Sequence, residues 1–421
     1  MKKYLFLVAL VASANLFAQP SPFLRSELVS FSDYAYLAED VKEIRKNRLV
    51  NLKTFNTYAA QPNTVILDTR SDEMYNAKHI KGAIHLNFSD FNEANLRKLI
   101  PDRTTRILIY CNNNFMQDIQ LSMEDAYFPS KISRSDVYFE LPDSMLLPNP
   151  EIQQFEINPN TRSRSGYRSE PVENNKPVQP ARTTPEIRQY TLALNIPTFI
   201  TLFGYGYNNV YELGELINTS DPNILFEGTS VPTDENKLKE QLALELARQT
   251  TAEQPLIPSV LVNFDDYSEL MNEVEPYREA HLVSMDQFNE LKSQDNTIIL
   301  DFRSKAQYDA KHIKGSIHLD FTEFTQQRLD ELIPDRNTTI LIYCNNNFVK
   351  ELETLTMDPP MQTKGLSYPT SNLLRYKRTM ALNIPAYINL YGYGFKNVYE
   401  LGELVLVTDE RVEFEGTAVS K

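Results

Sequence analysis

Short apolar runs alternate with amphipathic stretches along most of this 421-residue chain. Runs such as 297–300 and 340–343 are four residues long, which fits a strand buried on both faces and is too short for a buried helix. Stretches between them, such as 284–291, place apolar residues three and four positions apart, as on one side of a helix. Strands that alternate with helices predict an α/β fold, with a parallel sheet flanked by helices on both faces.

The same pattern occurs twice. Cys111 and Cys344 lie 233 positions apart and are flanked by matching residues, whereas Gly204 and Gly392 lie 188 positions apart. The first copy therefore carries 45 additional residues after its cysteine. Self-similarity of this kind indicates two copies of one structural unit, and two domains are the expected number for a chain of this length.

The repeat sets the predicted domain boundaries. We predict domain 1 over residues 27–232, a helical linker over 233–258 and domain 2 over 259–421. The linker is expected to be helical because leucines recur every fourth residue in it. A proline-rich insertion at about 117–187 interrupts domain 1. It is too long for a simple connection, and we expect a lid, a surface for a protein partner or a solvated polar loop.

The first 18 residues have the composition of a secretory signal peptide. Lys2 and Lys3 precede an apolar run over 4–12, and small residues follow up to Ala18. The run is too short to span a bilayer, and the pattern is typical of a leader that is removed on export. We therefore expect cleavage before Gln19 and a periplasmic or secreted protein. A buried first helix is the alternative interpretation.

Composition and charge narrow the classes of partner. A net charge of -14 argues against nucleic acid or an anionic membrane surface as the partner. No later window is apolar enough for a membrane helix. Two cysteines in an exported chain of this length do not make a disulfide framework. The five histidines are not spaced as metal ligands, so we expect no metal and no cofactor.

In each copy a buried strand leads to the only cysteine, which is followed by three asparagines and a phenylalanine. The two sets are Cys111, Asn112, Asn113, Asn114 and Phe115, and Cys344, Asn345, Asn346, Asn347 and Phe348. Asparagine closes tight turns, so we expect a loop at the carboxyl end of the strand, where parallel sheets form their sites. A thiol beneath a turn of backbone amides is where a cysteine nucleophile is placed. The alternative is a small buried residue that only fills space.

The order of motifs around these loops resembles the rhodanese-like sulfurtransferases. In the first copy the residues that carry the resemblance are Asp68-Thr-Arg70, Tyr75, His79-Ile-Lys-Gly82 and Cys111. In the second copy they are Asp301-Phe-Arg303, Tyr308, His312-Ile-Lys-Gly315 and Cys344. The resemblance implies two rhodanese-like domains in tandem.

The resemblance also implies a chemistry. Cys111 and Cys344 would each take sulfane sulfur from a small sulfur-containing anion and pass it as a persulfide to a thiol or another thiophilic acceptor. Backbone amides of the loops would hold the anion. Four residues would brace the loops, namely Asp68, Arg70, Asp301 and Arg303. The two motif histidines would be packed and hydrogen bonded rather than catalytic.

The loops also depart from the family pattern. The fifth residue after the cysteine is cationic in many sulfurtransferases, but here it is Met116 or Val349. Rhodanese-like phosphatases need an arginine at the sixth position, where Gln117 and Lys350 stand, so a phosphatase is disfavoured. We expect basic residues at the ends of the insertions to supply the missing charge as anion-binding groups. These candidates are Arg182, Arg188, Arg375 and Arg378.

Two further expectations concern function and the state of the thiols. A catalytically weak binding module and a redox sensor with exposed thiols are the alternatives to sulfur transfer. We expect both thiols to be free, because a disulfide needs Cα atoms within about 7 Å of each other.

Overall fold

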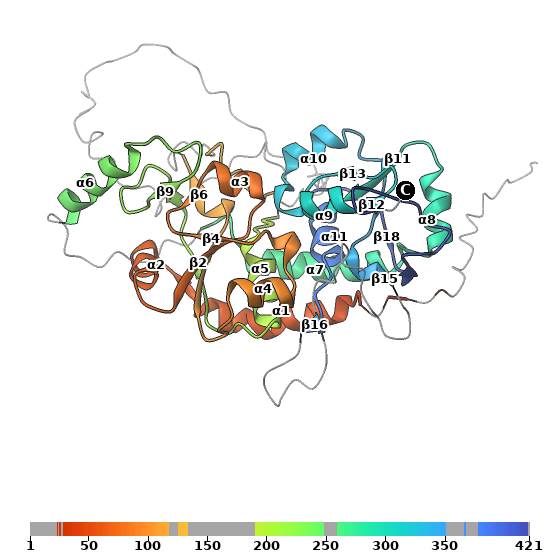
Figure 1. The fold of residues 1–421 in the computed structure, drawn as a ribbon, viewed down its shortest axis with the longest axis horizontal. Coiled ribbons are helices and arrows are strands. Elements are labelled where there is room, and N and C mark those ends of the chain that lie inside the picture. The colour runs from red at the N-terminus through yellow and green to blue at the C-terminus, as the bar shows by residue number, and fades with distance from the viewer. Residues whose placement is uncertain are drawn as a thin grey trace, which may run out of the picture.

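We describe the protein from a computed structural model. The described residues are 23, 25–26, 28–117, 125–133, 190–247, 259–350, 366–367 and 378–419. The predicted signal peptide and most of the predicted insertion lie outside these residues. Figure 1 shows two lobes side by side, lobe 1 coloured red to green and lobe 2 teal to blue.

Each lobe is built on a five-stranded sheet, and the two sheets have the same topology. The strand order is β1-β7-β5-β2-β4 in lobe 1 and β10-β18-β14-β11-β13 in lobe 2, and all of these pairings are parallel. The strands of lobe 1 are β1 (Leu49–Val50), β2 (Thr64–Asp68), β4 (Ile84–His85), β5 (Arg106–Tyr110) and β7 (Val210–Leu213). Those of lobe 2 are β10 (Leu282–Val283), β11 (Thr297–Asp301), β13 (Ile317–His318), β14 (Thr339–Ile342) and β18 (Val398–Leu401). The predicted α/β class and parallel sheets are confirmed.

Helices cover both faces of each sheet. Those of lobe 1 are α1 (Phe31–Lys46), α2 (Leu52–Ala59), α3 (Asp72–Ala77), α4 (Glu93–Leu99) and α5 (Asn195–Gly204). Those of lobe 2 are α7 (Phe264–Glu279), α8 (Met285–Lys292), α9 (Lys305–Ala310), α10 (Gln326–Leu332) and α11 (Asn383–Gly392). Many begin after a serine, threonine or asparagine whose side chain accepts an N–H of the first turn.

The alternation of side chains along β5 decides which way the cysteine points. Ile107 and Ile109 pack with α1, α4 and α5, whereas Leu108 and Tyr110 pack with α2 on the other face. Successive residues of a strand point to opposite faces, so Cys111 continues the row of Ile107 and Ile109. It therefore points into the cluster that also joins the two lobes. Cys344 lies in this same cluster.

The junction between the lobes is apolar at its centre and polar around it. Phe88 and Phe321 lie with ring centroids 5.5 Å apart, and Asn87 Nδ2 donates to Asp320 Oδ2 at 2.7 Å. All four residues are buried. The lobes therefore share one continuous core instead of meeting across a wet cleft.

A further helix, α6 (Glu235–Ala247), lies within the predicted linker and far from the junction of the lobes (Figure 1). Its Leu238 and Leu242 are exposed, whereas Lys239 is buried and donates to Thr219 O at 2.6 Å. The predicted helix is present, but these two leucines face solvent. No helix in the described ranges is both long and apolar enough to cross a membrane.

Candidate functional site

The cysteine loops are short, tight turns. Asn112–Asn114 and Asn345–Asn347 each form a single 3₁₀ turn, η2 and η6, directly after the cysteine. The chain then enters β6 (Phe115–Met116), which pairs with β8 (Ile217–Asn218) in lobe 1. In lobe 2 the corresponding pair is β15 (Phe348–Val349) with β19 (Val405–Leu406). The fifth residue after each cysteine is thus a buried strand residue, which explains why it is apolar and not a cation.

Each thiol is buried beneath its loop. Cys111 and Cys344 are each 1% exposed. Burial raises the pKa of Cys111 to about 12, although backbone N–H groups of Asn195 and Asn113 hydrogen bond to the sulfur and lower it. Burial also raises the pKa of Cys344 to about 12, against the N–H groups of Asn383 and Asn346. The expected amide donors are present, but desolvation outweighs them and keeps both thiols neutral near pH 7.

The first turn of a helix therefore faces each sulfur. Asn195 and Asn383 are the first residues of α5 and α11, and their N–H groups are among the unpaired donors of the helix start. The N–H group at each helix start lowers the pKa of the thiol and so favours the thiolate, but burial raises that pKa by more.

A buried polar network holds the loop of lobe 1 from below. Asn114 Oδ1 accepts from Cys111 N at 3.0 Å and from Asn195 Nδ2 at 3.0 Å. Asn195 Nδ2 also lies 3.2 Å from Glu212 Oε1, and Glu212 pairs with Arg45 through two hydrogen bonds of 2.5 and 2.7 Å. Such charges are tolerated in a core only when each is paired and hydrogen bonded.

Lobe 2 repeats this network with Arg278, Glu400, Asn383 and Asn347. Sequence reasoning named Asn114 and Asn347 as loop residues but missed the other members of the two networks, which are Arg45, Glu212, Asn195, Arg278, Glu400 and Asn383. The signal was a glutamate inside the apolar strand Val-Tyr-Glu-Leu, because both copies contain it.

A second network holds the loop from the side. Arg70 is fully buried, pairs with Asp68 at 2.6 Å and donates from Nη1 to Asn112 Oδ1 at 3.3 Å. Burial acts to raise the pKa of Asp68, but the charge of Arg70 and hydrogen bonds from Arg70 and Tyr110 outweigh it and hold that pKa below its ordinary value. The ion pair thus braces the first asparagine of the loop.

Lobe 2 has the same brace. Arg303 pairs with Asp301 and donates to Asn345 Oδ1 at 2.8 Å, and Tyr343 donates to Asp301 at 2.6 Å. Asn345 Nδ2 also donates to Gln307 Oε1 at 2.7 Å. The braces belong to the structural frame of the loops, since both arginines are buried and neither reaches solvent.

Two segments from outside the loops cover them, and we call these segments straps. Strap 1 consists of the described residues between Arg25 and Ser30, and strap 2 of residues 259–263. Ser26 Oγ donates to Asn346 O at 2.7 Å, and Asn346 Nδ2 donates to Leu28 O at 2.6 Å. The middle asparagine of the second loop is therefore fastened to a segment that precedes α1.

Strap 2 makes the equivalent contacts to the first loop. Ser259 Oγ donates to Asn113 O at 2.7 Å, and Asn113 Nδ2 donates to Leu261 O at 2.6 Å. Each strap also forms a backbone hydrogen bond to the glycine after the last sheet strand, Ser26 to Gly402 and Ser259 to Gly214. The thiols are thus covered by these straps as well as by their own turns.

In the described part of the insertion, a lysine lies near Cys111. Lys131 is 0% exposed, and its Nζ donates to Phe321 O of lobe 2 at 2.7 Å. Its backbone N–H donates to Asn113 Oδ1 at 2.7 Å, so the lysine is tied directly to the cysteine loop. Burial lowers the pKa of Lys131 to about 7, against opposing effects of Asp320, Cys111 and Glu323. In turn, its charge lowers the pKa of Cys111, though far less than burial raises it.

The cations chosen from the sequence cannot be placed relative to the cysteines, because their side chains lie outside what the structure describes. Arg182, Arg188 and Arg375 lie outside the described residues, as does the side chain of Arg378. The backbone of Arg378 forms β17 (Arg378–Thr379), which pairs with β16 (Leu366–Ser367). Their proposed role as anion-binding groups stays a prediction.

Three other expectations can be compared with the structure. Both cysteines are free, as predicted. The redox-sensor alternative assumed exposed thiols and is wrong on that point, because both are buried.

His79 stacks on Tyr75 with ring centroids 3.9 Å apart and contacts Tyr75 O through Nδ1 at 2.7 Å, which fits the expected packing role. Within the described part of the chain, no three His, Cys, Asp or Glu side chains are grouped to hold a metal ion.

Comparisons with known proteins agree with this architecture. Residues 52–127 and 284–357 each match the model of the rhodanese-like domain, and each match includes one cysteine. The thiosulfate sulfurtransferase PspE of Escherichia coli (strain K12) is 35% identical over 46 residues, which cover 11% of this chain and 43% of that protein. The chain thus spans less than half the length of this curated relative.

Two solved structures are also similar. The thiosulfate sulfurtransferase of Pseudomonas aeruginosa is 13% identical with a TM-score of 0.36, and the match covers 90% of this chain and 47% of that one. The 3-mercaptopyruvate sulfotransferase of Escherichia coli is 11% identical with a TM-score of 0.23, covering 85% of this chain and 98% of that one.

Proposed function

Because the chain contains two rhodanese-like domains, we propose that it carries or transfers sulfane sulfur as a persulfide on Cys111 and Cys344. The observation that supports this proposal is the position of each thiol. It lies at the carboxyl end of the central strand, with an N–H of the loop and the first N–H of a helix directed at its sulfur. Hydrogen-bond donors that already point at a reacting atom stabilise the negative charge that develops on it.

The proposed reaction needs an open conformation. A thiol with a pKa of about 12 is almost entirely protonated at neutral pH, and the thiolate is the nucleophile. Once the loop is hydrated, the pKa falls and the thiolate attacks the outer sulfur of a donor such as thiosulfate. A bond forms between the cysteine sulfur and the sulfane sulfur, and sulfite leaves with the electron pair of the broken bond.

The second half of the reaction restores the cysteine. A thiophilic acceptor, such as cyanide or a thiolate, attacks the outer sulfur of the persulfide. The cysteine leaves as a thiolate, so the protein undergoes no net oxidation. The acceptor and donor are identified only by class, as a nucleophilic thiophile and a small sulfane-sulfur anion.

Mass spectrometry of the native protein after treatment with thiosulfate or polysulfide tests the proposal. We expect a gain of one sulfur atom at Cys111, at Cys344 or at both, and cyanide should remove it as thiocyanate. The variants Cys111→Ser and Cys344→Ser assign the site, and the double variant should release no thiocyanate. Undiminished release by the double variant would exclude the cysteines as carriers.

The covered loops favour one second candidate, a binding module without sulfur chemistry. Both thiols are 1% exposed, and each loop is fastened by a strap. In that case neither cysteine would gain sulfur in the native protein, although both would do so after unfolding. The proposed binding surface is the proline-rich insertion.

We also propose export, on the basis of the leader at residues 1–18. Sequencing of the mature N-terminus in cells of the source organism tests this proposal, and we expect it to begin at Gln19. A mature chain that begins at Met1 would contradict export by this route.

A further inference from the structure

The two straps are crossed between the lobes. Strap 1 leads into α1, which packs against α5 of lobe 1, but it covers the cysteine loop of lobe 2. Strap 2 leads into α7, which packs against α11 of lobe 2, but it covers the loop of lobe 1. The end of each strap that leads into its helix is also hydrogen bonded to the opposite lobe. Ser30 N donates to Thr379 Oγ1, and Asn263 N donates to Thr191 Oγ1, each at 3.0 Å.

We propose that the straps are crossed lids, so that strap 1 controls access to Cys344 and strap 2 controls access to Cys111. This regulatory role rests on the proposed sulfur chemistry of the two cysteines, but access to a thiol can be measured without that chemistry. Each thiol would then be uncovered by movement of a segment that belongs to the opposite lobe.

The middle asparagine couples the lid to the thiol. The backbone N–H of Asn113 hydrogen bonds to the sulfur of Cys111, while its side-chain amide and its carbonyl oxygen are held by strap 2. Asn346 has the same three contacts to Cys344 and strap 1. Release of a strap therefore removes two hydrogen bonds from Asn113 or Asn346, and the N–H of this same residue contacts the sulfur.

A strap can detach with little change to the main core, because its buried apolar anchor packs in a small separate cluster and a single half-buried valine, Val29 or Val262, contacts the main core. Leu28 of strap 1 is buried with Val349 and Leu404, and none of these three belongs to the core that joins the lobes. Leu261 of strap 2 is likewise buried in a separate cluster, with Met116, Ile132 and Leu216. Release of either strap exposes one of these small clusters and the contact of Val29 or Val262 with the edge of the shared core, but none of the core's buried residues belongs to a strap.

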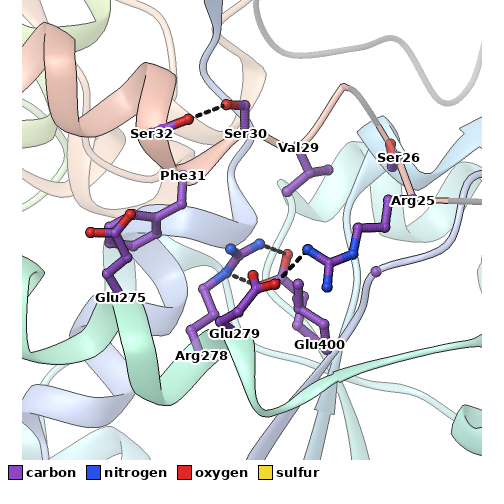
Figure 2. Close-up of a pocket in the computed structure, with 12 residues that line it drawn as sticks. Arg25, Ser26, Val29, Ser30, Phe31, Ser32, Glu275, Arg278, Glu279 and Glu400 are labelled. Carbon is purple, nitrogen blue, oxygen red and sulfur yellow. Dashed lines mark hydrogen bonds and ion pairs between the residues drawn. The ribbon is translucent and has the colours of Figure 1, made fainter. Parts of the chain in front are cut away.

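Figure 2 shows the side of strap 1 that faces lobe 2. Strap 1, the start of α1, α7 and the end of β18 line a cavity of about 310 Å³. At its edge Arg25, which is 60% exposed, pairs with Glu279 at 2.5 Å, and on its floor Arg278 pairs with Glu400. Strap 1 thus borders a cavity along one side and is held to lobe 2 by its hydrogen bonds, by the ion pair of Arg25 and by the packing of Leu28 and Val29.

Alkylation of the native full-length protein by iodoacetamide, read at each cysteine by mass spectrometry, tests the crossed lids. We expect Ser26→Ala to speed alkylation of Cys344 about fivefold, the weight of one hydrogen bond, and to leave Cys111 unchanged. Ser259→Ala should do the reverse. Leu28→Ala and Leu261→Ala should give the same crossed pattern with an effect of more than about tenfold, because they remove a buried anchor.

Ser284→Ala is the matched control, since it removes one hydrogen bond at the start of α8 and touches neither strap. It should change neither rate. If each serine variant exposes the cysteine of its own lobe, if both cysteines respond equally, or if neither rate changes, the crossed lids are wrong. Crossed alkylation without any sulfur loading would instead retain the lids and reject the proposed sulfur transfer.

Discussion

The hydroxyl groups of Tyr34 and Tyr267 lie 3.1 Å apart in the buried junction between the lobes. The two residues occupy the same position in the two repeats, 233 residues apart. Phe88 and Phe321 also form an equivalent pair at the junction. Equivalent residues that meet each other indicate an approximate two-fold axis, so the junction resembles the isologous interface of a homodimer within one chain. Under this symmetry the two straps are equivalent segments, so when one covers the loop of the opposite lobe the other does so too.

The tyrosine pair allows a direct test of this arrangement. We expect Tyr34→Phe or Tyr267→Phe to lower the free energy of unfolding by about 1 to 3 kcal/mol, because each leaves one buried hydroxyl without its partner. The double variant should lose less than the sum of the two, since it removes both hydroxyls. Urea denaturation measures all four proteins. Tyr36→Phe is a suitable control because Tyr36 is 65% exposed. Strictly additive losses would mean that the hydroxyls do not interact.

The second prediction concerns the pH dependence that Lys131 confers on stability. Burial lowers the pKa of Lys131 to about 7 from an ordinary value of 10.5. Between these values the unfolded chain holds a proton that the folded protein lacks, so this group makes stability rise with pH by up to about 1.4 kcal/mol per pH unit. Lys131→Met keeps the apolar stem and removes the charge. We expect it to stabilise the protein at neutral and lower pH and to flatten the rise.

The measurement is the free energy of unfolding from about pH 7 to about pH 8.5. In this window the other ionisable groups beside Lys131 do not titrate in the folded protein. Burial raises the pKa of Asp320 to about 6, so it titrates below this window, and the Cys111 thiol titrates above it. Glu323 faces Lys131 as a further carboxylate. Lys131→Arg stays charged throughout this window, so it should also lose the slope, but without the stabilisation expected of Lys131→Met. Equal slopes in the wild type and in Lys131→Met would contradict the lowered pKa.

Much of the fold could be predicted because it depends on local pattern and on the repeat. The helix expected over 284–291 is α8 (Met285–Lys292), and the strand expected over 297–300 is β11 (Thr297–Asp301). The position of Cys111 at the end of a central strand also follows from local sequence. These features depend on neighbouring residues, whose alternation of apolar and polar side chains carries the information.

The cover that the straps place over the two cysteine loops could not be predicted from local pattern. Asn113 is held by Leu261 and Ser259, which lie 148 and 146 residues away, and no motif marks a serine or a leucine as a cover. The pKa of Cys111 is set mainly by this burial, which the sequence of the loop does not show. The repeat gave no signal for Lys131 either. Ile132 pairs with Thr191 as Leu366 pairs with Thr379, and a glycine precedes Leu366 in the sequence.

The last prediction asks whether the thiols are neutral in the folded protein. The pKa of each cysteine rises from an ordinary value of 9.0 to about 12 on folding, mainly through burial. The folded protein then holds a proton that the unfolded chain loses between about pH 9 and about pH 12. Stability from this source is full below pH 9 and falls by about 1.4 kcal/mol per pH unit above it for each cysteine.

Cys111→Ser and Cys344→Ser remove one of these contributions each. Each variant should be less stable than the wild type at about pH 8, because a hydroxyl replaces a thiol in an apolar site. The difference should shrink as the pH rises from about 9 to about 10, since only the wild type still loses stability through that cysteine. The buried tyrosines titrate equally in both proteins and cancel. Lys131 cancels for Cys344→Ser, which is therefore the cleaner of the two comparisons, whereas Cys111 itself raises the pKa of Lys131. A difference that does not change with pH would mean that the folded thiol has an ordinary pKa, and burial would then not be what keeps it protonated.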